Sequence, residues 1–384
     1  MFHDPHSRVF FQRAGHILRA GGRGYPMIAR GALEPVGTDG GRQVLEVHAR
    51  LMRRRGFLVA LMAVMTLLAI MLDMTTGPSG MGLSELWKVV TGHPDTTRPM
   101  EVIFWNVRLP IAMMAVLVGA ALSLAGAEMQ TVLDNPLASP FTLGVSSAAS
   151  LGASLAIILG LGLPFVPPHM IIAGNAFVFA LGSVLLLQYL ARGGGGIETL
   201  VLFGIALVFT FNALVALVQF MASADALQQL VFWSMGNLGA ASWETVAVLG
   251  LVTVLLFPFS LASSWKMTAL RLGEERAASF GIDVGRLRFF SLLRVSLLAA
   301  TAVAFVGTVG FIGLVGPHIA RLMVGEDHRF LLPASLCSGA LVMSLASVAS
   351  KTLVPGMLLP VGIVTSLVGL PIFFVLIHRR RRRP

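Results

Sequence analysis

Ionisable side chains within apolar segments are the first candidates for chemistry in this sequence. In a membrane, such groups form proton relays or ion sites when they face one another at mid-depth. Here they are sparse: Glu128 and Arg294 lie near one end of apolar runs, and Asp73 and Glu244 lie near the other end. Each side chain is close enough to the end of its run to reach the lipid headgroups, so we interpret all four as interfacial.

Catalytic residues and resident cofactors are not predicted. No serine has an evident basic partner, and no Gly-rich phosphate-binding loop follows a strand. His318 and His328 are not spaced with carboxylates as metal ligands would be, and the single cysteine, Cys337, lies in an apolar run. We therefore expect a protein that is not an enzyme and that holds no cofactor or metal.

The composition defines the class of protein. Of 384 residues, 56% are hydrophobic and only 12% are charged, and the net charge is +10. The mean hydropathy is +0.83. A soluble fold does not need so much apolar surface, so the chain is predicted to be a multi-pass inner-membrane protein. The basic residues cluster beside apolar runs, which indicates membrane orientation and not nucleic-acid binding.

Ten apolar runs predict an all-α membrane fold with about ten transmembrane helices. They cover residues 57–72, 109–127, 140–161, 168–191, 199–221, 244–262, 289–309, 310–324, 331–351 and 360–377. The run 310–324 is the weakest, because it is short and contains Pro317, His318 and Arg321. The alternative is that 289–324 forms one long broken helix.

Three regions are expected along the chain. Residues 1–55 are expected to form a disordered cytoplasmic leader, because their first part is Gly-rich and has no periodic pattern of apolar residues. The Arg run that follows Met52 resembles the start of a membrane protein, so part of the leader can reflect an over-extended gene. Residues 56–379 are the transmembrane domain. Residues 380–384 form a basic cytoplasmic tail, interpreted as a lipid anchor in preference to a nucleic-acid site.

The distribution of basic residues predicts the orientation. With a cytoplasmic amino terminus, the inside holds Arg50, Arg53, Arg54, Arg55, Arg192, Lys266, Arg271, Arg276, Arg286, Arg288, Arg329 and residues 379–383. The outside then keeps only Lys88, Arg98, Arg108 and Lys351. Because inner loops carry the basic excess, both termini are expected in the cytoplasm.

Small residues are frequent within the spans. They allow helices to pack closely, which accounts for most of them, or they line a passage for a bulky solute. The candidates for such a path or for packing are Gly144, Ser146, Ser147, Gly310, Gly313, Gly316 and Pro317. Without membrane-buried ionisable pairs, the energy for transport has to come from elsewhere.

The segment 267–288 is a charged, helix-forming stretch between two apolar runs. Glu274 and Glu275 lie in the first turn of a predicted two-turn helix, where the helix dipole favours negative charge. Gly281 suits a left-handed stop, and Asp283 can cap a second short helix. Ala277 and Phe280 share a face that fits a groove on a partner. An amphipathic hairpin on the membrane surface is the alternative.

Four long stretches carry a resemblance to a known family. Residues 108–153, 272–282 ("LGEERAASFGI"), 310–335 and 359–377 resemble the FecCD family of type II ABC importer permeases. The resemblance covers nearly everything from about residue 57 onward. It implies a ten-span ABC type II importer permease fold, a homodimer of permeases, a cytosolic ABC ATPase dimer and an extracytoplasmic solute-binding protein.

The same resemblance implies roles for particular residues. Coupling helices at about 268–288 would contact the ATPase through Leu272, Gly273, Glu274, Glu275, Ala277, Phe280 and Gly281. Arg108 and Lys351 would dock the binding protein, although Lys351 stands where the family usually has Arg, and Ile111 stands where a second Arg is common.

Ferric siderophore, the commonest cargo of that family, is the favoured substrate, with haem or cobalamin as the alternatives. Two other classes stay open. An intramembrane enzyme would work without an ATPase partner, and a secondary transporter would still take up its substrate in a strain that lacks the ATPase.

Overall fold

The computed structural model describes residues 38–77, 80–162, 164, 166–191, 196–354 and 357–381, which form helices and connecting turns. The chain divides into two compact units, residues 1–52 and residues 53–384, and the second is described below. The elements in order are α2 (Thr38–Thr75), α3 (Leu83–Thr91), α4 (Arg98–Val102), η2 (Ile103–Arg108), α5 (Leu109–Val132), η3 (Pro140–Leu143), α6 (Val145–Leu159), η4 (Pro168–Met170), α7 (Ile171–Leu190), α8 (Gly196–Phe220), α9 (Ala224–Ser234), α10 (Trp243–Ala262), α11 (Ser264–Leu270), α12 (Glu274–Ser279), α13 (Val284–Val306), α14 (Ile312–Val324), α15 (His328–Thr352) and α16 (Val361–Arg381).

The predicted all-α membrane fold is confirmed. Among the described residues, seven helical segments are long and apolar enough to cross a bilayer: Leu45–Thr75, Arg98–Val132, Pro168–Leu190, Gly196–Phe220, Trp243–Ala262, Val284–Val306 and His328–Thr352. Three shorter apolar helices, Val145–Leu159, Ile312–Val324 and Val361–Pro371, correspond to the remaining predicted runs. The stretch 289–324 is two helices, because α13 ends at Val306, Gly307 follows with a φ of 78°, and α14 starts at Ile312.

The structure describes only parts of the predicted leader and tail. Residues 38–55 are helical and continue directly into the first span, because α2 extends over Thr38–Thr75. The stretch that follows residue 42 is rich in strong helix formers such as Leu, Arg and Glu. At the other end, α16 continues to Arg381. Residues 1–37 and 382–384 lie outside the described residues.

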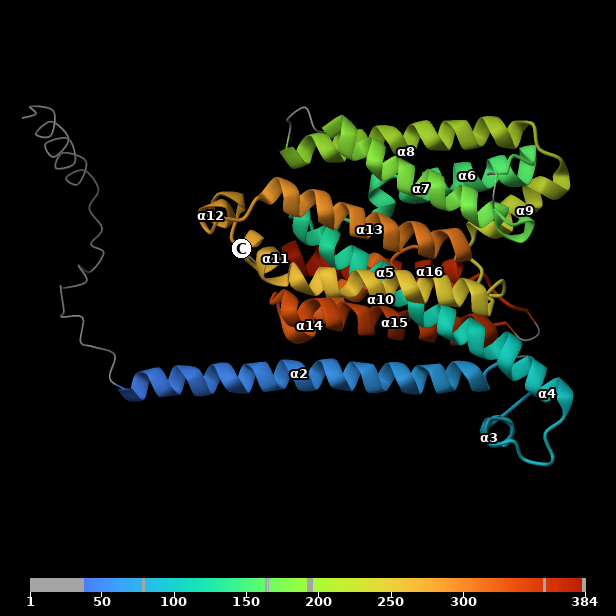
Figure 1. Cartoon of the computed structure of the whole chain (residues 1–384), viewed down its shortest axis with the longest axis horizontal. Helices are drawn as coiled ribbons and strands as arrows, with labels where there is room; N and C mark the ends of the chain where they lie inside the picture. Colours follow the sequence, from blue (N-terminus) through green and yellow to red (C-terminus); the bar gives the residue numbers. More distant parts are fainter. Residues whose placement is uncertain are drawn as a thin grey trace, which may run out of the picture. The chain divides into compact units, whose positions relative to one another are not determined.

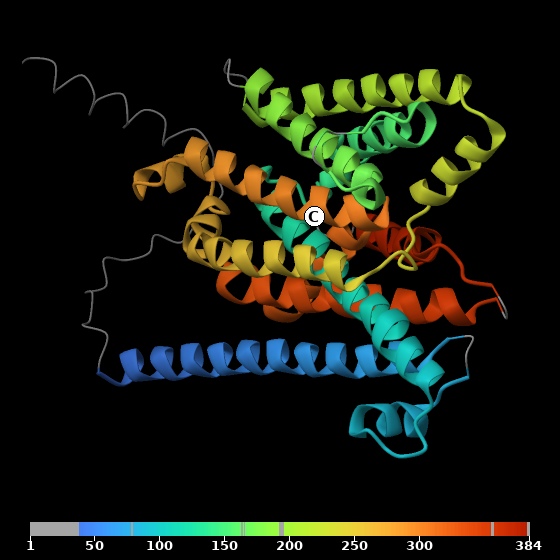
Figure 2. The same ribbon diagram turned by 45° about the vertical axis from the view of Figure 1, so that its right-hand side comes forward.

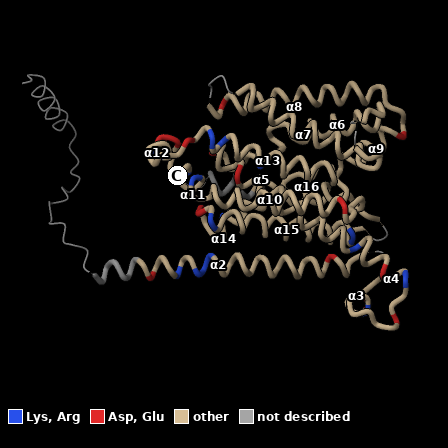
Figure 3. The backbone as a smooth tube through the Cα atoms, in the orientation of Figure 1, with Lys and Arg blue, Asp and Glu red and all other residues tan. Residues whose placement is uncertain are grey.

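The helices α3, α4, η2 and α9 lie outside the ten runs and were not predicted. α3 and α9 are too short to cross a bilayer, and they lie at the end of the bundle opposite α11 and α12 (Figures 1 and 2). We refer to these two ends as the α3 end and the α12 end. At the α3 end, α4 and the π-helical turn η2 extend α5 into one continuous helical segment, Arg98–Val132. Charged residues gather toward the two ends, with long uncharged stretches between them (Figure 3).

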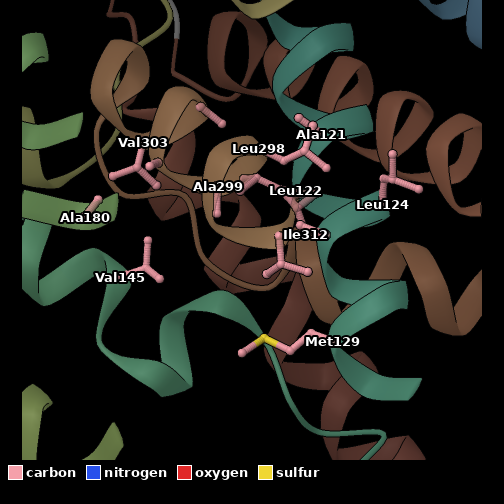
Figure 4. Close-up of a cluster of buried hydrophobic side chains, with 14 of the residues drawn as sticks. Ala121, Leu122, Leu124, Met129, Val145, Ala180, Leu298, Ala299, Val303 and Ile312 are labelled. Carbon is pink, nitrogen blue, oxygen red and sulfur yellow. The ribbon is translucent and has the colours of Figure 1, made fainter. Parts of the chain in front are cut away.

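The core is built around α5. Almost every residue of α5 from Val118 to Val132 is buried. Figure 4 shows Ala121 and Leu122 of this helix beside Leu298 of α13 and Ile312 of α14. A helix that is apolar all round is a helix surrounded by other helices, so α5 is the element on which the positions of α13, α14 and α15 depend.

Glycines set how closely α5 approaches α14 and α15. A Cβ atom added at Gly339 would overlap the carbonyl oxygen of Gly119, and one added at Gly126 would overlap the carbonyl oxygen of Gly313. At Gly316 an added Cβ would overlap the Ser123 hydroxyl. Small residues bring helix backbones close enough for extensive dispersion contacts, which is the main source of helix association in lipid. The predicted packing role of Gly313 and Gly316 is therefore consistent with their positions.

We expect Gly339→Ala to destabilise the protein, because the new methyl group has to push α5 and α15 apart. Overpacking of this kind typically costs roughly 1–3 kcal/mol, and it should appear as a lower Tm of the purified protein in detergent. Gly182→Ala on α7 is the matched control, because a Cβ added there meets no atom within 4 Å. Equal Tm values for the two variants would contradict the close α5–α15 contact.

Candidate functional site

A cavity of about 530 Å³ lies where several helix ends meet. Its walls carry neutral polar side chains: Ser146, Ser147, Ser150, Asn212, Ser234, Thr308 and Ser366. Phe141, Leu367 and Leu370 are among the apolar residues that complete the lining. The hydroxyl oxygen of Ser146 is buried and has no hydrogen-bond partner. The cavity can therefore accommodate a bulky solute that offers polar groups to hydroxyls and apolar groups to the remaining surface.

Backbone hydrogen bonds tie the helix ends that surround the cavity. The Asn237 amide donates to the Val306 carbonyl (2.7 Å), and the Gly362 amide donates to the Met235 carbonyl (3.1 Å). The Thr308 hydroxyl donates to the Ser234 carbonyl. Gly362 has to be glycine for close approach, because an added Cβ would overlap the Met235 carbonyl oxygen. The loops after α9 and α13 and the start of α16 therefore form one connected wall.

The predicted path and packing residues fall into two groups. Ser146, Ser147 and Gly310 line the cavity. Gly313, Gly316 and Pro317 are buried in α14, away from the cavity lining, where the helix packs against its neighbours. Gly144 adopts a left-handed conformation (φ 87°) at the start of α6, and so sets the direction in which that helix leaves the preceding turn.

Glu128 and Arg294 form a buried ion pair between α5 and α13. The Arg294 Nη2 donates to Glu128 Oε2 at 2.7 Å, its Nε donates to the same oxygen at 3.0 Å, and Nη2 also donates to the Ser291 hydroxyl. Glu128 is completely buried and Arg294 is 8% exposed. The interfacial interpretation of both residues is therefore wrong. The two residues are 166 positions apart in sequence. The positive guanidinium donates several hydrogen bonds to the carboxylate and so neutralises its charge inside the bundle.

A second charged cluster lies at the α3 end of the bundle. The Lys351 ammonium donates to Asp73 Oδ1 at 2.8 Å, and the Ser347 hydroxyl donates to Asp73 Oδ2 at 3.1 Å. Asp73 is completely buried, so the interpretation that its side chain reaches out to the headgroups is wrong. Arg108 is 5% exposed and donates to the carbonyl oxygens of Met74 and Met81. Both cations predicted to dock a binding protein thus connect α2, α5 and α15 internally. Glu244, by contrast, is exposed on the surface, as predicted.

The predicted helix of the 267–288 segment is confirmed, although its surroundings differ. We define the knob as residues 264–283, which contain α11 and α12. Gly281 has the expected left-handed conformation, with a φ of 79°. Asp283 acts as an N-cap by accepting from the Arg286 amide at 2.9 Å, but the helix that it caps is the long α13 and not a separate short helix.

The exposed and buried residues of the knob differ from the prediction at one position. Leu272 is 54% exposed and Phe280 is 55% exposed, so both present apolar surface. Ala277 is completely buried and packs in the same core cluster as Leu270 and Ile282. Ala277 and Phe280 therefore do not share an outward face, because Ala277 supports the knob from inside.

A polar network joins the knob to the ends of α5 and α14. Arg271 lies 3.3 Å from both Asp134 and Glu326, and Arg321 lies 3.1 Å from the other oxygen of Glu326. Arg321 also donates to Gln130, whose amide nitrogen donates to the carbonyl oxygen of Gly313. Sequence reasoning missed this network, since bonded members such as Gln130 and Arg321 are 191 positions apart along the chain.

The buried residue His328 reinforces the same connection. Its two ring nitrogens lie 2.7 Å from the Thr131 hydroxyl and 3.2 Å from the Thr268 hydroxyl. One ring thus joins the end of α5 to α11 of the knob.

Asp327, the residue before His328, has a perturbed carboxyl. The hydrogen bond from the Arg329 side chain holds the pKa of Asp327 below its usual range. The contribution of Asp327 to stability is thus present above the ordinary carboxyl pKa and is lost as the pH falls through the lowered value.

We expect Arg294→Met to be strongly destabilising, because it leaves the Glu128 carboxylate buried without its cation. Breaking a buried pair in this way typically costs roughly 3–5 kcal/mol. Arg286→Met is the control, because the Arg286–Asp283 pair lies on the surface with exposed side-chain fractions of 83% and 56%. Thermal unfolding in detergent measures both. A Tm for Arg294→Met that equals that of Arg286→Met would show that the buried pair contributes nothing.

Two transport permeases are similar to this chain over most of its length. The hemin transport system permease protein HmuU of Yersinia pestis is 36% identical over 341 residues, which are 88% of this chain and 98% of that protein. The vitamin B12 import system permease protein BtuC of Shigella boydii is 34% identical over 322 residues, which are 84% of this chain and 94% of that protein.

A solved structure shows the same fold. It is a transporter assigned to the metal-chelate type of ABC transporters, in an inward-facing conformation. It is 28% identical, with a TM-score of 0.75 over 84% of this chain and 99% of the other. The profile of the FecCD transport family matches residues 65–379, which include the cavity, the buried ion pairs and the knob. This chain belongs to the FecCD transport family.

Proposed function

We propose that this chain is the membrane permease subunit of an ABC importer that carries a bulky metal chelate into the cell. The observation that carries the proposal is the cavity of about 530 Å³, which lies between membrane-spanning helices and is lined by hydroxyls and apolar side chains. Membership of the FecCD family supports the same function. The chain itself is a transport subunit, and a separate ATPase would hydrolyse ATP.

Ferric siderophore is the proposed cargo. A ferric siderophore presents oxygen-rich polar groups around a shielded metal, which suits a wall of neutral hydroxyls. Haem and cobalamin are the alternatives, since the relatives HmuU and BtuC are permeases for hemin and vitamin B12. Uptake of each of the three chelates into proteoliposomes, with the binding protein outside and ATP inside, separates these cargoes. ATP-independent uptake would instead identify a secondary transporter.

The knob is the proposed contact for a cytosolic ATPase dimer. Leu272 and Phe280 offer exposed apolar surface. Gly273, Glu274, Glu275 and Gly281 are exposed beside them, and Ala277 keeps this surface in place from inside. In this orientation, both termini of the chain are cytoplasmic and the protein is in the inner membrane, as the distribution of basic residues favours.

Two further partners complete the proposed importer. A second copy of this permease would pair with the first, as in the homodimer that the family resemblance implies. A solute-binding protein would dock at the α3 end of the bundle. Because Arg108 and Lys351 are engaged with backbone carbonyls and Asp73, their proposed part in docking is to hold the ends of α2, α5 and α15 in shape.

We expect Phe280→Asp to abolish coupling to the ATPase. A charge at the centre of the exposed apolar surface would be desolvated on docking, which is costly without a partner charge. The variant should insert into the membrane normally. The amount of ATPase that co-purifies with it and its rate of ATP-driven uptake should each fall at least tenfold. Phe280→Leu is the matched control and should keep both, because it retains apolar surface. Full co-purification of the ATPase with Phe280→Asp would show that docking occurs elsewhere.

We also expect Ser150→Phe to obstruct transport. The larger side chain would occupy part of the cavity from the same face of α6 that carries Ser146 and Ser147. Uptake should fall at least fivefold while the variant still co-purifies with the ATPase. Ser150→Ala removes the hydroxyl without adding volume, so it should transport at nearly the parent rate. Unchanged uptake by Ser150→Phe would place the path outside this cavity.

A further inference from the structure

The short helix α3 (Leu83–Thr91) has three distinct faces. Leu86 and Val89 are buried in a small cluster with Met81 and Phe104. A second stripe, at helical spacing of four and three, is apolar but exposed: Leu83 is 64% exposed, Trp87 is 70% exposed and Val90 is 56% exposed. Ser84 and Thr91 are exposed on the third, polar face. One side of α3 therefore contacts protein, one is polar, and one is an apolar stripe that the chain leaves uncovered.

The depth of α3 follows from the helices beside it. The twenty steps from Arg55 to Thr75 along α2 span about 30 Å at about 1.5 Å per residue, which is about the thickness of the hydrocarbon core of a bilayer. With Arg55 at one boundary, Met74 lies at the other, and Met74 packs against the cluster that holds α3. The helix is therefore at the boundary between hydrocarbon and headgroups, not far out in the solvent.

The direction of α3 agrees with this depth. In Figure 1 the spanning helices run across the picture while α3 is seen almost end-on, and in Figure 2 the rotated view shows its length. The axis of α3 thus lies across the bundle axes, as in a helix parallel to the plane of a membrane. An exposed apolar stripe on such a helix can be buried in the upper acyl region while its polar face meets water.

Tryptophans mark the same level. Trp105 of η2 and Trp243 at the start of α10 are each 45% exposed, and the Trp243 indole donates to the Trp105 carbonyl at 2.9 Å. Val102 and Val107, beside Trp105, are 42% and 46% exposed. Tryptophan is enriched at membrane interfaces because its ring is apolar and its N–H is polar. Exposed apolar and tryptophan side chains of spanning helices are therefore present beside Phe104, which packs with the buried face of α3.

We propose that α3 is an interfacial anchor whose Leu83, Trp87 and Val90 stripe is buried in the outer leaflet of the lipid bilayer. The anchor fixes the α3 end of α2 and of the η2–α5 segment at one depth, because its buried face packs in one cluster with Phe104 of η2 and Met74 of α2. A protein partner at this stripe would leave it in water whenever that partner dissociated, whereas lipid is always present around the spans.

Quenching of tryptophan fluorescence by brominated phosphatidylcholine tests the proposal. The full-length parent and Trp87→Phe are each reconstituted into vesicles that carry bromine either near the headgroups or near the bilayer centre. We expect shallow bromines to quench the parent more than deep bromines do, and this difference to become smaller in Trp87→Phe; the exposed Trp105 and Trp243 at the same depth keep the rest of it. The measurement requires neither ATPase nor cargo, so its result is independent of the proposed transport function.

The control moves the same ring to the polar face. Relative to Trp87→Phe alone, the combination of Ser84→Trp with Trp87→Phe should add no quenched component, and the emission that it adds should lie at longer wavelength. Equal quenching at positions 84 and 87 would overturn the proposal, because α3 would then not be oriented. An unquenched Trp87 in the parent would also overturn it, and a change of its emission on adding the purified solute-binding protein would assign the stripe to that partner.

Discussion

The close contact of α5 with α14 and α15 is the constraint on which the rest of the structure depends. Apolar residues gain nothing by leaving lipid for a protein interior of similar polarity, so helix association there rests on packing and hydrogen bonds. Glycines at 119, 126, 313, 316 and 339 bring the three backbones together. The close approach also allows the Ser123 hydroxyl to donate to the Ser335 carbonyl at 2.6 Å, and the Ser338 hydroxyl to donate to the Gly316 carbonyl at 2.7 Å.

α14 is the element that the cavity and the knob share. The loop before it carries Thr308 and Gly310 into the cavity wall. Near its other end, Arg321 contacts Glu326, which in turn contacts Arg271 of the knob. A movement of the knob relative to α5 therefore has to change either this network or the position of α14. For the knob to be coupled to the cavity through these contacts, α14 has to adopt two discrete positions. Because glycines hold α14 close to α5, those two positions can differ only by sliding or rotation of the packed helices.

The positions of the ten apolar segments could be predicted from the sequence, because each segment has to satisfy its own backbone hydrogen bonds in lipid. Gly281 and Asp283 could be assigned to a helix stop and a helix start for similarly local reasons. The ion pairs could not be predicted, since Asp73 and Lys351 are 278 positions apart and neither position in sequence indicates the other. A charge near the end of an apolar run has two explanations, snorkelling or pairing, and only the neighbouring helices decide between them. The same holds for Ala277, which looks exposed in a short charged helix until Leu270 and Ile282 are folded against it.

The pairing of Glu128 with Arg294 has a consequence for how the chain is made. α5 enters the membrane long before α13, because 166 positions separate the two charges. At synthesis rates of about 5–20 residues per second, the carboxylate waits for roughly 10–30 s before its cation emerges. During that interval Glu128 has to be protonated, or be held near the headgroups, or be shielded by the insertion machinery, since a lone carboxylate is costly inside a bilayer. The final seating of α5 is therefore a late event in biogenesis, completed only after α13, α14 and α15 have been inserted.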